Sequence, residues 1–158
     1  SDKPKDCQFY SFSEMSQNFQ AVFDRYKTKA NILIGHSYGG AFAAFLALNN
    51  RTDIQNLILL APTPLKPKTF LPKLINLPVF VLEFMRPLLD KNFVKLAYHA
   101  NTDPNLVALE RELTHKNPLY AIKPMILGTL NIPACDVRQI KQPTLVLTAE
   151  QDGIVPAK

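Results

Sequence analysis

The fold of this chain is decided by the stretch Asn31-Ile32-Leu33-Ile34-Gly35-His36-Ser37-Tyr38-Gly39-Gly40-Ala41-Phe42-Ala43-Ala44. A short aliphatic run, a glycine-rich turn and a small apolar segment follow one another, which predicts a buried strand, a sharp turn and a buried helix. The turn spells G-x-S-x-G around Ser37, the pattern of a nucleophile elbow, in which a strained turn exposes the serine oxygen above a sheet. Because strand and helix approach closely in such a turn, we expect Gly35 and Gly39 to be required sterically.

Glycine is concentrated in this turn, since Gly35, Gly39 and Gly40 are three of only five glycines in the chain. A glycine turn with an incidental serine is the alternative interpretation. The order strand, motif, helix is the context that favours the elbow.

Composition describes a folded protein of single-domain length, with 158 residues, 47% hydrophobic and 20% charged. The net charge of +5 is spread over separate lysines, which gives nucleic-acid binding no support but is compatible with peripheral contact with an anionic membrane. Cys7 and Cys135 form neither a disulfide framework nor a metal motif, and no motif calls for a cofactor. With no signal peptide and no apolar run of the ~20 residues that span a bilayer, we expect an intracellular location, cytoplasmic or peripheral to a membrane.

The segments around the elbow fit an α/β arrangement. An S-x-x-E capping box at Ser11 and an aromatic stripe at helical spacing predict a helix over Ser13–Lys27 whose stripe lies in the core. Residues 41–48 predict the helix after the elbow, and the run ending at Ala61 predicts a second buried strand. Strand, helix and strand form a right-handed crossover by default.

Residues 63–138 have a different character, with many prolines between short apolar pieces. The pieces 74–82 and 84–89 are apolar nearly all round, and short helices are predicted at 92–99, 105–115 and 121–130. A helical cap or lid insertion is the natural assignment, although such helices can also pack without touching substrate. Thr144–Ala149 predicts a third strand. We therefore expect a partial α/β fold, with a parallel sheet of about three strands divided as core 1–62, cap 63–138 and core 139–158.

A serine hydroxyl needs a base to take its proton and a carboxylate to orient that base. Asp152 is the best carboxylate, because it follows the third strand at the sheet edge where open α/β sheets place their sites; Glu150 is the reserve, and a turn-forming aspartate before Gly153 is the alternative. The chain contains three histidines that could be the base. We expect His36 to shape the elbow, and His99 and His115 to be surface or packing residues of the expected cap. The order Ser, Asp, His places the base beyond Asp152.

At this point the chain resembles the α/β-hydrolase superfamily, through Gly35-His36-Ser37-Tyr38-Gly39-Gly40 and the stretch Pro143 to Pro156. Tyr10-Ser11-Phe12, Phe23-Asp24-Arg25-Tyr26 and the strand into the elbow look like the branch of α/β-hydrolase domain-containing protein 8. The resemblance implies Ser37 as nucleophile, Asp152 as triad acid and the Tyr38 backbone N–H as an oxyanion-hole donor. It also implies further strands at the start and a catalytic histidine at the end, so we expect this chain to be the middle of a hydrolase.

Two functions follow from the sequence. The first is a serine hydrolase acting on carboxylic esters or lipids, with a small-molecule substrate and no cofactor or metal. The second is a non-catalytic binding or scaffold member of the same fold, since fold does not dictate function. These 158 residues alone contain no base in the expected position, so we expect no ester turnover from them.

Overall fold

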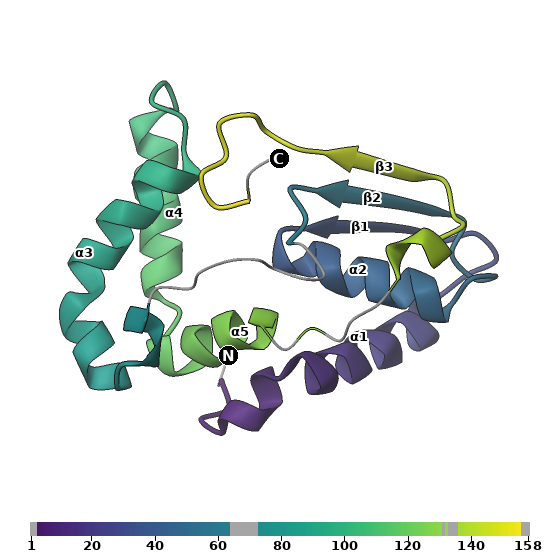
Figure 1. Cartoon of the computed structure of the whole chain (residues 1–158), viewed down its shortest axis with the longest axis horizontal. Helices are drawn as coiled ribbons and strands as arrows, with labels where there is room; N and C mark the ends of the chain where they lie inside the picture. The colour runs from purple at the N-terminus through teal and green to yellow at the C-terminus, as the bar shows by residue number, and fades with distance from the viewer. Residues whose placement is uncertain (1–2, 64–72, 131, 133–135, 156–158) are drawn as a thin grey trace.

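The fold is built on a parallel sheet with the strand order β1-β2-β3 in a computed structural model, which describes residues 3–63, 73–130, 132 and 136–155. The strands are β1 (Ile32–His36), β2 (Asn56–Leu60) and β3 (Thr144–Leu147). Gly35 lies beside Leu59, which lies beside Val146. The three strands end at the same edge of the sheet (Figure 1). The predicted parallel three-stranded sheet is confirmed, although β3 ends at Leu147 instead of Ala149.

Two helices form a layer on one face of this sheet: α2 (Tyr38–Asn49) packs against the strands, and α1 (Phe12–Tyr26) packs against α2 (Figure 1). Helix α1 begins where the capping box predicted, because Ser11 Oγ accepts a hydrogen bond from the Glu14 N–H at 3.2 Å. The aromatic stripe is only partly core. Phe12 and Phe23 are buried, but Val22 and Tyr26 are 57% and 70% exposed. The prediction that the stripe lies in the core therefore holds for only part of it, since α2 covers only one side of α1.

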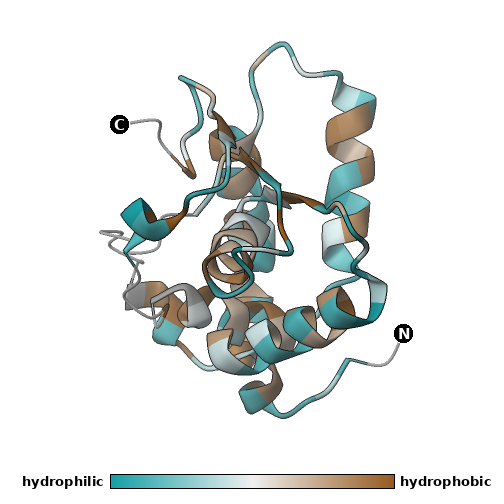
Figure 2. Cartoon of the chain, turned by 90° about the vertical axis from the view of Figure 1, so that its right-hand side faces the viewer, coloured by the Kyte–Doolittle hydropathy of each residue, from teal (hydrophilic) through white to brown (hydrophobic). Residues whose placement is uncertain are grey.

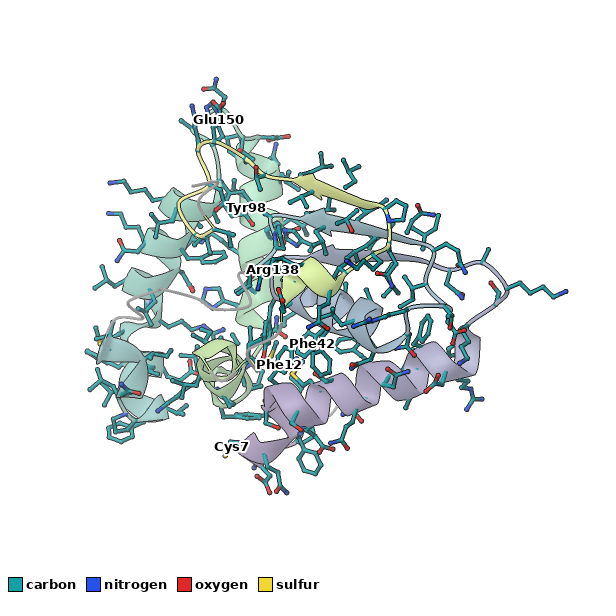
Figure 3. The ribbon with its side chains drawn as sticks, turned by 45° about the vertical axis from the view of Figure 1, so that its right-hand side comes forward. Cys7, Phe12, Phe42, Tyr98, Arg138 and Glu150 are labelled. Carbon is teal, nitrogen blue, oxygen red and sulfur yellow. The ribbon has the colours of Figure 1, made fainter. Side chains whose placement is uncertain are left out.

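The core lies between α2, α1 and the sheet. Leu57 and Ala47 are completely buried at the α2–sheet contact, and Phe23 of α1 joins the same cluster. Near the start of α1, Phe12 stacks on Phe42 with 4.7 Å between ring centroids (Figure 3). Figure 2 shows the apolar segments gathered around α2 at the centre of the molecule. The small side chains after the elbow thus let α2 sit close to the strands.

The segment between β2 and β3 contains three longer helices, α3 (Val79–Ala97), α4 (Pro104–His115) and α5 (Leu119–Leu130). Short 3-10 turns lie at η1 (Cys7–Tyr10), η2 (Lys73–Asn76) and η3 (Val137–Gln139). A single 19-residue helix α3 replaces the separate pieces that the prolines predicted. Pro87 lies inside it. A proline removes one hydrogen bond and kinks a helix without ending it where packing compensates. Leu82, one turn earlier, is 2% exposed and supplies such packing.

Side-chain to backbone hydrogen bonds tie these three helices together. Arg86 of α3 donates to the carbonyl oxygens of Thr114 and Asn117, at 3.2 and 2.7 Å, just where α4 ends. Glu83 Oε1 accepts from the Leu119 N–H at 3.2 Å, where α5 begins. Helix α3 therefore satisfies backbone groups that the ends of its two neighbours leave open.

Both outer strands of the described sheet pair on one side only, β1 and β3 each with β2. The face of the sheet away from α2 is also open, since Ile32 and Ile34 are 59% and 66% exposed. None of the helices in the described ranges has the length and apolarity to cross a membrane. Cys7 is an exposed free thiol, whereas Cys135 lies outside the described residues.

Candidate active site

Ser37 occupies the sharp turn between β1 and α2. Its backbone lies at φ 51° and ψ −122°, in the range of φ that side chains other than glycine rarely adopt. Such a conformation costs about 1–3 kcal/mol and persists only where the surrounding structure enforces it. The turn is therefore the strained elbow that the sequence predicted, with Ser37 at the N-cap of α2.

The end of β2 holds this turn in place. The Ser37 N–H donates to the Leu60 carbonyl at 2.9 Å, and the Ser37 carbonyl accepts from the N–H groups of Gly40 and Thr63 at 2.9 and 3.0 Å. Ala61 also has a positive φ, 39°, and its N–H donates to the Leu147 carbonyl of β3 at 2.7 Å. Sequence reasoning missed the role of residues 61–63, because alanine, proline and threonine carry no signal for a second strained position.

The glycines of the turn have different roles. A Cβ on Gly35 would lie 2.7 Å from the Gly39 carbonyl oxygen and 2.7 Å from the Gly40 Cα, so no side chain fits there. A Cβ on Gly40 would lie 2.7 Å from the Pro62 Cβ. At Gly39 nothing lies within 4 Å. The predicted steric need is met at Gly35, but at Gly39 the prediction was wrong; Gly40 is the second crowded position, because the end of β2 crosses there.

Tyr38 is the first residue of α2, and its backbone and its side chain have different environments. An N–H in the first turn of a helix has no intrahelical carbonyl to bond, and the helix dipole favours negative charge beside it. The side chain packs on Phe42, with 4.7 Å between ring centroids. Its hydroxyl is buried without a hydrogen-bond partner among the described residues, and a Cβ on Gly128 of α5 would come within 2.9 Å of it. Burial raises the pKa of the Tyr38 phenol to about 12.

Asp152 lies on the loop that follows β3, and this loop leaves the sheet at the edge where all three strands end (Figure 1). Its Oδ1 accepts from the N–H groups of Ile154 and Val155, both at 2.8 Å. Asp152 therefore does form the turn considered as an alternative, while Oδ2 takes no part in these two bonds. The ends of β1 and β3 are two strand spacings apart, about 9.5 Å, and within the described residues no hydrogen bond links Asp152 to Ser37.

The three histidines have separate environments. His36 is exposed at the end of β1, with the alternation of the strand placing it on the open face of the sheet. His99 lines a hollow of about 710 Å³ together with Asp152, Glu150 and Tyr98, the last two labelled in Figure 3, and its Nδ1 accepts from the Asn101 N–H at 3.1 Å. Between β2 and β3, His115 Nε2 of α4 lies 2.6 Å from Asp90 Oδ2 of α3. In the described part of the chain, none of them bridges Ser37 and Asp152.

A second hollow, of about 430 Å³, adjoins the other side of the elbow. It lies between α2 and the strands, and its lining is mostly small or aliphatic: Gly40, Ala41, Ala44, Leu59, Pro62 and Val146 are among the residues. No group of three or more His, Cys, Asp or Glu side chains in the described ranges could hold a metal ion.

A strained serine between a parallel strand and a buried helix, with a carboxylate beyond the last strand, defines an α/β-hydrolase. The comparisons with known proteins agree: residues 1–158 match the family described as serine aminopeptidase, S33, and the chain belongs to that family. Over the whole length of this chain, it is similar to Protein ABHD8 of mouse, at 27% identity, and to Protein ABHD8 of human, at 26% identity. The chain spans 37% of the length of these relatives.

Solved structures show the same fold. The esterase EaEST from Exiguobacterium antarcticum is 20% identical, with a TM-score of 0.77 over 99% of this chain and 61% of that one. A bromoperoxidase from Bacillus anthracis is 17% identical, with a TM-score of 0.74 over 99% and 61%. A thermophilic esterase from Thermogutta terrifontis is 20% identical, with a TM-score of 0.73 over 92% and 56%. At these identities the likeness establishes the fold alone.

Proposed function

We propose that this chain carries the nucleophile and the acid of a serine hydrolase that cleaves carboxylic esters, including lipid esters. The observation that supports this most directly is the backbone of Ser37, held at φ 51° by the crowded Gly35 and by hydrogen bonds to the end of β2. Strain of this kind tends to cluster at functional sites. A turn that merely connected a strand to a helix would not need it.

In the proposed reaction the Ser37 Oγ attacks the ester carbonyl carbon while an imidazole takes its proton. The negative charge that develops on the carbonyl oxygen is stabilised by the Tyr38 N–H and the N-terminal end of α2. The C–O bond then breaks, and the leaving alcohol receives the proton from the imidazolium. Water repeats the sequence on the acylated Ser37, releasing the carboxylic acid and restoring the hydroxyl.

Asp152 is proposed to orient that imidazole. Two backbone N–H groups fix its Oδ1, which leaves Oδ2 to accept from an imidazole Nδ1–H. The base itself is proposed to be a histidine of the natural protein that follows residue 158. His99 is the competing candidate on structural grounds, because it shares a hollow with Asp152 and Glu150.

We propose that the substrate carries an apolar acyl group. The hollow beside the elbow is lined mainly by small and aliphatic side chains, and Gly40 and Pro62 of the elbow region contribute to it. Several proteins of similar fold are described as esterases, which makes ester substrates the first class to test. The family description adds aminoacyl substrates as the second.

The test uses the natural full-length protein and a fluorophosphonate probe, which labels an activated serine. We expect labelling that Ser37→Ala abolishes and that Ser13→Ala, at an exposed serine of α1, leaves unchanged. Hydrolysis of p-nitrophenyl esters of increasing chain length is then compared with that of aminoacyl p-nitroanilides. Full-length protein that is folded but takes no label would contradict the proposal and favour the non-catalytic member of the fold.

A further inference from the structure

Helix α3 exposes a stripe of large apolar side chains along its outer side. Phe80, Phe84 and Leu88 are 76%, 88% and 55% exposed. They are spaced four residues apart, so they follow one another along one side of the helix. Figure 1 places α3 at the edge of the molecule, away from the sheet. Exposed apolar residues scattered singly are ordinary, but a contiguous row of two phenylalanines and a leucine marks an interaction surface.

Two lysines continue the row toward the end of the helix. At 100° per residue, Lys91 and Lys95 fall within the same arc of about 80° as the three apolar side chains, and both are exposed. The acids of α3 lie outside this arc and have partners of their own. Glu83 pairs with Arg86 at 3.1 Å and Asp90 with His115 at 2.6 Å. The arc itself therefore presents apolar and positive groups without an acidic side chain. At its far end, Lys95 also lines the hollow that contains Glu150 and Asp152 of the loop after β3.

We propose that this stripe, consisting of Phe80, Phe84, Leu88, Lys91 and Lys95, docks on a lipid surface that contains anionic headgroups. Aromatic and aliphatic side chains enter the boundary between headgroups and acyl chains, while lysines keep their stems in the apolar layer and their ammonium groups at the phosphates. A positive end beside an apolar one matches that boundary in both polarity and charge. A second copy of the chain fits less well, because its own stripe offers no acidic side chain to pair with these lysines.

The experiment measures sedimentation of the full-length protein with vesicles of phosphatidylcholine alone or of equal parts phosphatidylcholine and phosphatidylserine. We expect binding to the mixed vesicles. Lys91→Gln and Lys95→Gln should each weaken it about fivefold, since each lysine near an anionic surface contributes about 1 kcal/mol. Phe84→Ser should weaken binding at least tenfold. The matched control is Tyr26→Ser, at an aromatic residue of α1 that is 70% exposed, which should leave binding unchanged.

A second measurement detects contact of the stripe with lipid directly and does not need a variant that binds the vesicles more weakly. Because the chain contains no tryptophan, the fluorescence gained by Phe84→Trp reports on this position when the parent protein's signal is subtracted, and it should shift to shorter wavelength when mixed vesicles are added. Equal binding by Phe84→Ser and the parent protein would overturn the proposal, as would an absence of binding. A dimer that Phe84→Ser dissociates, with no affinity for vesicles, would instead assign the stripe to a second copy.

Discussion

Gly35→Ala should destabilise the fold strongly, although it adds only one methyl group. The new Cβ would lie 2.7 Å from the Gly39 carbonyl oxygen, 2.7 Å from the Gly40 Cα and 2.8 Å from the Ala43 Cβ. All three atoms belong to backbone or to an alanine, so none can move aside by changing a rotamer. The contacts are about 0.7–0.8 Å shorter than an ordinary carbon contact of ~3.5 Å, which forces β1 and α2 apart. Overpacking of this kind costs about 1–3 kcal/mol, occasionally more.

Gly39→Ala provides the matched control within the same turn. Its Cβ meets nothing within 4 Å, and its φ is not positive. Alanine at a compatible helical position stabilises a protein by about 0.4–1 kcal/mol, chiefly by restricting the unfolded chain. The two variants should therefore differ by about 1.4–4 kcal/mol in the free energy of unfolding, with opposite signs relative to the parent protein.

Urea unfolding of the full-length protein, followed by circular dichroism, measures this difference directly. At equal slope, the midpoint of Gly35→Ala should move to lower urea and that of Gly39→Ala to equal or higher urea. If Gly35→Ala unfolded at the parent's midpoint, or if both variants lost similar stability, the close approach of β1 and α2 at Gly35 would be refuted.

Three further predictions concern the elbow, the acid loop and the end of α1. Tyr38→Phe removes a buried hydroxyl that has no partner among the described residues, so thermal unfolding should show stability unchanged or raised by up to about 1 kcal/mol; a clear loss would mean that the hydroxyl is satisfied. Gly153→Ala would place a Cβ 2.9 Å from Leu96 Cδ2 and 3.1 Å from the Leu96 carbonyl oxygen, which should displace Asp152. Under the proposed function, this variant should lower kcat more than it changes KM on an ester that the full-length parent protein cleaves, and an unchanged kcat would contradict this. Hydrogen bonds from Gln20 and Lys27 lower the pKa of Asp24. The stability that the Asp24 carboxylate contributes is therefore complete above the ordinary aspartate pKa and is lost as pH falls through the lowered pKa. The urea midpoint of Asp24→Asn should depend less on pH below 5 than that of the parent protein, and parallel curves would refute the lowered pKa.

The sequence was sufficient for the elements whose signal is local. The aliphatic runs before Gly35 and Ala61, and the capping pair at Ser11 and Glu14, each determine a strand or a helix start from neighbouring residues alone. The strained turn at Ser37 follows in the same way, because G-x-S-x-G reports on the turn in which it occurs.

Features that depend on distant segments could not be read in this way. Pro62, just after β2, is the residue that leaves no room for a side chain at Gly40. The G-x-S-x-G motif does not include Pro62, so it could not show that Gly40 is crowded and Gly39 is not. Helix α3 continues through Pro87 because tertiary packing outweighs the local cost of a proline. The exposure of Val22 and Tyr26 depends on which side of α1 is covered, and periodicity does not contain that information.

The open sides of β1 and β3 have a consequence for any attempt to produce these 158 residues in isolation. Each copy would offer one unpaired strand at one border and a different strand at the other, so β3 of one molecule could pair with β1 of the next. Such head-to-tail pairing leaves a new unpaired border after every addition, so it extends into filaments without closing. Light scattering that grows with protein concentration would reveal this polymerisation, and a monodisperse monomer would exclude it.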